Sequence, residues 1–66
     1  LDVYEQSGSL VNITLFNAQG QMVTTLHDGL LSVGKHLFTI AHQPAGLYTV
    51  VMSKDTHTAI QRVVFR

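Results

Sequence analysis

The 66-residue sequence predicts an all-β fold, a small antiparallel β-sandwich of about six to seven short strands. Apolar and polar residues alternate along several runs, which is the period of a strand with one buried face. The five glycines and the single proline, Pro44, fall in the gaps between these runs, where turns need them. No stretch has the period of a helix. We therefore expect two packed sheets within one domain, residues 1–66.

The composition limits what can hold this domain together and what it can bind. Hydrophobic residues make up 45% of the chain and charged residues 12%, which favours a folded core over disorder. There is no cysteine, so packing must stabilise the fold without disulfides. A formal net charge of +0 argues against nucleic acid as a partner. No apolar run is long enough for a spanning helix, so membrane insertion is not expected.

The N-terminal part predicts two strands. The first covers residues 1–5, and the polar residues 6–9 after it, with Gly8 among them, are typical of a hairpin loop. Residues 10–17 form the most regular strand, because three aliphatic side chains alternate with polar or aromatic ones. The chain opens at Leu1 within an alternating pattern, and we expect it to belong to a longer protein.

A turn and a third strand follow. Residues 17–20 have Asn first and Gly fourth, the order favoured by a type I turn whose last residue is left-handed. The β-favouring run 22–26 predicts a strand that closes at 27–29, His-Asp-Gly. Residues 30–34 are less regular and predict either a short edge piece or a loop that covers the core.

The C-terminal half predicts three more strands. Residues 36–41 carry apolar side chains on both faces, which favours a central strand. Residues 43–46 have Pro second and Gly fourth, as in a turn, and lead into a strand over 48–52. A polar loop at 53–57 then precedes the last strand, 58–66.

No catalytic constellation is apparent. A nucleophile needs a base within hydrogen-bond reach and a third group to orient that base. The serines lie in turn contexts, the carboxylates are scattered, and the adjacent His27 and Asp28 would diverge on a strand. We expect neither an enzyme nor a cofactor.

The four histidines raise the question of a metal site. His36 and His42 share one side of the predicted strand, but six residues at about 3.3 Å each place them roughly 20 Å apart. A cross-strand site that uses His27 or His57 stays open beside the simpler interpretation of surface histidines. We expect no metal.

Two further groups are candidates for binding surfaces. Two tyrosines and three phenylalanines could stack on sugar rings, although aromatic residues on strands are more often core or cross-strand partners. Arg62, Val64 and Arg66 share one side of the last strand. They form either a solvated edge or a contact surface.

Taken in order and spacing, the segments 15–23, 26–29, 34–36, 44–50 and 61–64 resemble the C-terminal sorting domain of type IX secretion substrates in Bacteroidetes. The likeness spans nearly the whole chain. It implies an Ig-like sandwich at the C-terminal end of a larger secreted protein, exported through the periplasm to the cell surface. The implied partners are an N-terminal passenger, shuttle proteins and the outer-membrane translocon, and the implied role is a non-catalytic sorting signal.

The resemblance also assigns individual residues. Asn17 and Gly20 match the end of a strand where the family has a Tyr-Asp pair and a glycine, with Phe16-Asn17 in place of Tyr-Asp. The Pro-x-Gly-x-Tyr motif is matched by Pro44, Gly46 and Tyr48, and Arg62 falls where a lysine is usual. We expect the machinery to contact Arg62, Val64 and Arg66.

Two alternatives remain open at this point. The Pro-Asn-Pro segment that opens the first strand of the sorting-domain family is absent from this chain. The Ig-like domain of flagellar hook-capping proteins has a similar pattern, and this second resemblance indicates a structural or assembly role. The second alternative is an accessory β-sandwich that binds a glycan or a neighbouring domain of a surface enzyme. A row of exposed Tyr or Phe side chains on one sheet face would favour the glycan-binding role.

Overall fold

The computed structural model describes residues 1–5, 8–54 and 57–66, and every regular element in these ranges is a β-strand. The six strands are β1 (Asp2–Glu5), β2 (Ser9–Phe16), β3 (Met22–Leu31), β4 (Gly34–Leu37), β5 (Gly46–Lys54) and β6 (His57–Phe65). The predicted all-β class is confirmed.

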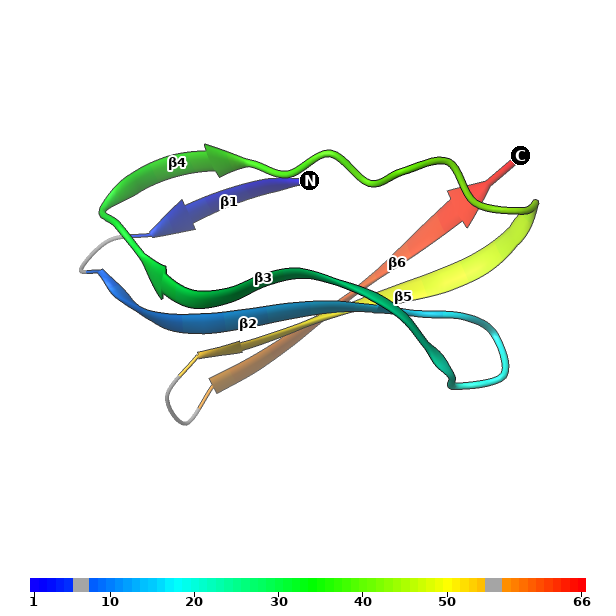
Figure 1. Ribbon diagram of the computed structural model, residues 1–66, viewed down its shortest axis with the longest axis horizontal. Coiled ribbons are helices and arrows are strands. Elements are labelled where there is room, and N and C mark those ends of the chain that lie inside the picture. The colour runs from blue at the N-terminus through cyan, green and yellow to red at the C-terminus, as the bar shows by residue number, and fades with distance from the viewer. Residues whose placement is uncertain (6–7, 55–56) are drawn as a thin grey trace.

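The strands form two antiparallel layers (Figure 1). The larger sheet has the order β3-β2-β5-β6, and the smaller one pairs β1 with β4. In Figure 1, β1 and β4 lie above β2 and β3, while β6 crosses behind them at an angle. The architecture is a small β-sandwich, as the spacing of strands and turns predicts.

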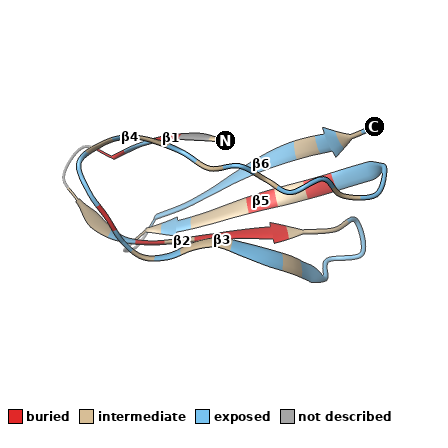
Figure 2. Ribbon diagram, turned by 45° about the horizontal axis from the view of Figure 1, so that its top comes forward, coloured by how far each residue is buried: buried red, intermediate tan, exposed pale blue. Residues whose placement is uncertain are grey.

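The core lies between the two layers. Strand β2 contributes Val11, Ile13 and Leu15, and the last two are fully buried. Strand β5 adds Tyr48 and Val50, whose buried segments stand beside those of β2 in Figure 2. The core is completed by Val3 of β1 and Leu31 of β3. The alternation that predicts β2 from the sequence is therefore the pattern that fills the core.

Strand β3 is longer than the sequence suggests, and two β-bulges interrupt its pairing with β2. The pairing of β2 with β3 shifts between Ile13 and Thr14 and again between Leu15 and Phe16. Each shift adds one residue to β3, Leu26 and Val23 respectively, and both pack against the core. A bulge changes the direction of a side chain without ending the strand. The predicted end at residues 27–29 is wrong, because Gly29 pairs with Val11 and the strand continues to Leu31.

The predicted central strand over 36–41 is also wrong. Strand β4 covers only Gly34–Leu37 and belongs to the two-stranded sheet. Phe38 and Ile40 leave the strand but still pack against the core, from an irregular segment that leads to β5. Their apolar alternation reflects this packing and not a place in the middle of a sheet.

Two predicted connections also differ from the pairing of the strands that flank them. Strand β1 pairs with β4 and not with β2, so these two strands do not form the expected hairpin. Of the residues predicted as a loop over 53–57, Ser53 and Lys54 belong to β5 and His57 belongs to β6, and Lys54 pairs with His57. Residues 6–7 and 55–56 of these two loops lie outside the described ranges.

An ion pair joins the two layers at one end. The Nζ of Lys54, near the end of β5, lies 2.5 Å from Oε1 of Glu5 at the end of β1. The Glu5 side chain is only 2% exposed, whereas that of Lys54 is 34% exposed. A buried carboxylate depends on its charged partner, because burial removes its hydration.

Lys54→Met is expected to lower the free energy of unfolding by about 2 kcal/mol, somewhat less than the loss of a partner from a fully buried pair. Urea denaturation of both proteins measures the difference. Lys54→Arg keeps the positive charge, so its free energy of unfolding should fall much less. A loss below about 0.5 kcal/mol for Lys54→Met would show that solvent screens the pair as at an exposed site.

Candidate docking surface on the outer face

The outer face is the side of the four-stranded sheet that points away from β1 and β4. Because Tyr48 and Val50 of β5 are buried between the layers, the residues that alternate with them lie on the outer face. The cross-strand pairs of β5 and β6 on this face are Leu47–Val64, Thr49–Arg62 and Val51–Ile60. Nothing from the described part of the smaller sheet covers them.

A groove of about 450 Å³ crosses the outer face at one end of the sheet. Strands β2, β5 and β6 and the β2–β3 turn all contribute to its lining: Phe16, Asn17, Ala18, Gly20, Leu47, Thr49, Val51 and Arg62. Asn17, Gly20 and Arg62, which the sequence resemblance singles out in separate motifs, therefore line a single groove.

The β2–β3 turn forms one wall of this groove and has the geometry that the sequence predicts. Gly20 has φ of 82° and donates its N–H to the Asn17 carbonyl at 3.0 Å. The Asn17 side-chain Oδ1 accepts the backbone N–H of Gln19 at 3.0 Å and that of Gln21 at 2.9 Å. An Asn side chain that bonds its own turn in this way fixes the loop locally.

The tyrosine of the Pro-x-Gly-x-Tyr segment, Tyr48, points to the inner side of the sheet and has a structural role. The Tyr48 hydroxyl donates to the Pro44 carbonyl at 2.8 Å, and the ring meets Phe65 edge-on with 5.1 Å between centroids. Residues 43–46 do not form the predicted turn: Ala45 is a bend, and Gly46 already belongs to β5. The arrangement is similar to the tyrosine corner of β-sandwiches, in which a Tyr hydroxyl bonds the backbone a few residues upstream.

Tyr48→Phe is expected to lower the free energy of unfolding by about 1 to 2 kcal/mol, because the Pro44 carbonyl loses its donor while the ring packing stays. Thermal unfolding followed by circular dichroism measures this change. Tyr4→Phe serves as the control, because Tyr4 is 69% exposed and should unfold as the parent does. Equal melting temperatures for the Tyr48 variant and the parent would contradict the corner.

The three residues predicted to contact the secretion machinery do not lie in one place. Arg62 lines the groove, and Val64 is exposed beside Leu47 on the same face. Arg66 follows the end of β6 and is exposed, but it does not line the groove. Phe16 and Leu47 fall within the matched segments but were not predicted as contact residues, although Leu47 alternates with the buried Tyr48 and could have been assigned to the outer face.

Three of the four histidines lie beside phenylalanine rings, and the fourth, His57, is exposed at the start of β6. The rings of His27 and His36 lie 5.6 and 6.4 Å from that of Phe38, and His42 meets Phe65 at 6.2 Å. The Nε2 atom of His36 lies 2.7 Å from the Ser32 carbonyl oxygen. Across the described residues, no three His, Cys, Asp or Glu side chains come together as a metal site would require.

The aromatic side chains do not form a row on the surface. Tyr4 is strongly exposed, whereas Tyr48 is buried and Phe38 and Phe65 pack against the core. Phe16 is half-buried in the groove of the outer face. The row of exposed rings that would favour a glycan-binding face is thus not formed.

Comparison with family models, with curated proteins and with solved structures gives no match to this chain. Within the described ranges there is also no helix with the length and hydrophobicity needed to cross a bilayer.

Proposed function

We propose that this chain is a non-catalytic sorting domain that directs an N-terminal passenger through type IX secretion to the cell surface. Shuttle proteins and the outer-membrane translocon are its proposed partners. The sequence resemblance supports the secretion route. The observation that supports a docking role is the groove that brings Asn17 and Gly20 together with Arg62, which come from two distant segments of the chain.

The chemistry of the groove suits contact with another protein. Arg62 is an exposed cation, while Leu47 and Val64 beside it are 42% and 58% exposed apolar residues. An Arg within an apolar surface is a common anchor of protein interfaces, because its guanidinium can hold a carboxylate with two hydrogen bonds. We therefore expect the partner to offer a carboxylate opposite Arg62 and apolar side chains opposite its neighbours.

The test is export of a reporter protein fused in front of this chain in a bacterium with type IX secretion. Arg62→Glu reverses the charge in the groove and should reduce the exported reporter at least tenfold. Thr58→Glu is the matched control: Thr58 lies on the same face of the same strand, outside the groove, and should leave export unchanged. Normal export of a folded Arg62→Glu fusion would reject the groove as the recognised surface.

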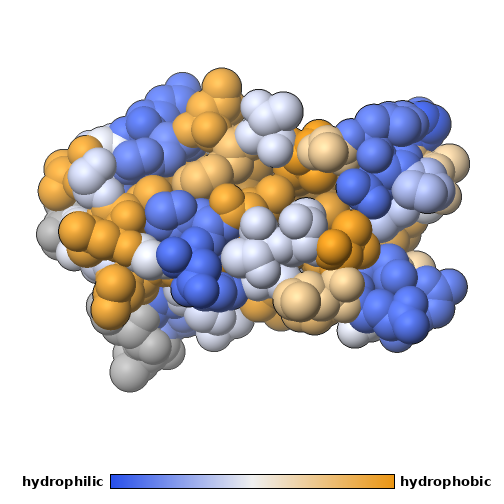
Figure 3. All heavy atoms as spheres, viewed as in Figure 1, coloured by the Kyte–Doolittle hydropathy of each residue, from blue (hydrophilic) through white to orange (hydrophobic). Residues whose placement is uncertain are grey.

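A structural assembly domain is the second candidate, and the amount of exposed apolar surface favours it. Hydrophobic side chains are visible along much of the face shown in Figure 3, between groups of hydrophilic ones at the end with the C-terminus and elsewhere on the face. Among the residues that the structure describes, nine large hydrophobic ones are exposed, including Leu30 and Leu37 at 71% and 75%. Sedimentation velocity separates the two: an assembly domain should self-associate at micromolar concentration, and a sorting domain should stay monomeric.

A further inference from the structure

We infer that the free edge of β1 accepts an extended strand from a separate polypeptide. The added strand would pair with β1 through main-chain hydrogen bonds and cover part of the inner face of the large sheet. The two layers are unequal, since two strands face four. This inference concerns the inner face and does not depend on the proposed secretion role of the outer face.

The hydrogen bonds to β4 show which backbone groups of β1 are free for a new strand. The Leu1 N–H donates to the Phe38 carbonyl and the Phe38 N–H donates to the Leu1 carbonyl, each at 2.9 Å. Hydrogen-bonded and non-hydrogen-bonded pairs alternate along an antiparallel ladder. Asp2 and Tyr4, one and three residues further on, therefore point their N–H and C=O groups away from β4. In the described part of the chain, no strand pairs with that edge.

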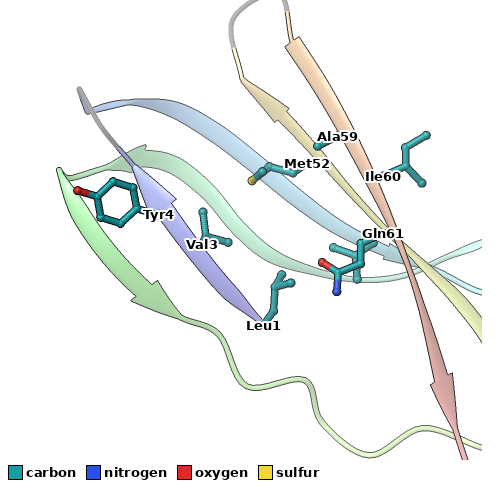
Figure 4. Close-up of a pocket in the computed structure, with 8 residues that line it drawn as sticks. Leu1, Val3, Tyr4, Met52, Ala59, Ile60 and Gln61 are labelled. Atoms are coloured by element: carbon teal, nitrogen blue, oxygen red, sulfur yellow. The ribbon is translucent and has the colours of Figure 1, made fainter.

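An open hollow of about 230 Å³ lies beside this edge (Figure 4). Leu1 and Val3 point into it from β1, and Met52, Ala59 and Gln61 line it from β5 and β6. No charged side chain lines the hollow, and the Gln61 amide and the Tyr4 hydroxyl are the only polar side-chain groups among its lining residues. The edge thus offers backbone groups that no described strand pairs with, next to a space whose lining side chains are uncharged and mostly apolar.

An extended peptide segment is the occupant that fits both features. Its backbone would bond the free groups of Asp2 and Tyr4, and every second side chain would enter the hollow. The volume is below the roughly 300 to 1,000 Å³ typical of small-molecule pockets and suits a few small apolar side chains. The neutral lining favours a segment with uncharged residues such as valine at alternate positions.

The experiment is an NMR titration of the isotope-labelled chain with the synthetic peptide acetyl-Ser-Val-Thr-Val-Ser-amide. The amide signals of Asp2 and Tyr4 should shift, and exchange of these amide protons with solvent should slow at least tenfold. Tyr4→Pro removes one free-edge N–H while leaving the β4 ladder intact, and edge strands tolerate proline. It should weaken peptide binding at least tenfold, whereas the matched Tyr4→Thr should bind as the parent does.

Several results would overturn the inference. Equal binding by Tyr4→Pro, or by a peptide methylated at its backbone nitrogens, would show that no strand pairing is involved. A dimer of the chain that Tyr4→Pro dissociates would identify a second copy as the occupant. If the chain is folded and the amide signals of Asp2 and Tyr4 do not shift at millimolar peptide, the edge of β1 does not accept the peptide.

Two more variants keep the test decisive. If Tyr4→Pro does not fold, Ala59→Phe, which fills the hollow from β6, should weaken binding at least tenfold, and unchanged binding would overturn the proposal. Arg62→Glu, on the outer face, should bind the peptide normally. Failure of the export test and failure of this test are therefore separate results.

Discussion

Ile13→Ala is expected to leave the domain largely unfolded at 25 °C. Ile13 has no exposed surface and lies on β2, a central strand of the large sheet. Truncation of a buried isoleucine to alanine costs about 2 to 5 kcal/mol, because it removes buried methyl groups and leaves a cavity. A single core in a chain of this size supplies only about 3 to 5 kcal/mol in total. Far-ultraviolet circular dichroism and urea denaturation measure the result.

Two controls make this prediction specific. Ile13→Val should remain folded and lose about 1 kcal/mol. Leu10→Ala changes a residue on the same strand that is 69% exposed, and it should leave stability nearly unchanged. A folded Ile13→Ala variant with the stability of Leu10→Ala would contradict the assignment of Ile13 to the centre of the core.

Gly46→Val is expected to lower the melting temperature by about 8 to 16 °C. Gly46 begins β5 with φ of 153°, a backbone conformation that residues with a side chain rarely adopt. The nearest atom to an added Cβ is Cε1 of Tyr48 at 3.9 Å, so backbone strain and not a clash is the cause. Such strain costs about 1 to 3 kcal/mol, and about 2 kcal/mol corresponds to this temperature change in a domain of this size.

Chemical synthesis of the 66-residue chain offers a sharper control for the same position. D-alanine at position 46 favours positive φ and should melt close to the parent, whereas L-alanine should melt lower. Ala45→Val, one residue earlier and exposed, should have little effect. Equal melting temperatures for the D- and L-alanine proteins would show that the backbone conformation at Gly46 is not what matters.

Elements that depend on local chemistry could be predicted from the sequence. Strand β2 follows from the alternation of its residues, and its buried apolar residues are the predicted aliphatic ones, with Thr14 buried beside them. The turn at 17–20 follows from Asn17 and Gly20, because an Asn side chain and a left-handed glycine act within a few residues. Such signals do not require knowledge of the rest of the fold.

Elements that depend on partners far away in the sequence could not be predicted from the sequence. Nothing near Val3 indicates that β1 pairs with β4, which lies about thirty residues further along the chain. The bulges that turn Val23 and Leu26 toward the core break the two-residue period, so β3 is only partly visible in the sequence. Phe38 and Ile40 alternate as in a strand but pack from an irregular segment.

The candidate site also has residues that the sequence motifs could identify and an arrangement that they could not. Arg62, Asn17 and Gly20 could be named from motifs, but their meeting in one groove depends on the order β3-β2-β5-β6. Phe16 and Leu47 join them only because β2 and β5 are neighbours in the sheet. Tyr48 belongs to the same motif as Gly46, yet it stabilises the corner on the opposite face.

The central claim is that the outer face is the surface recognised during export, and site-specific photo-crosslinking tests it most directly. A photoreactive phenylalanine at Leu47 in the groove, or at Thr58 outside it, is placed in a reporter fusion within a type IX secreting bacterium. We predict a crosslink from position 47, and not from position 58, to a translocon or shuttle protein. An exported fusion that forms no crosslink from position 47, or forms it equally from position 58, would contradict the claim.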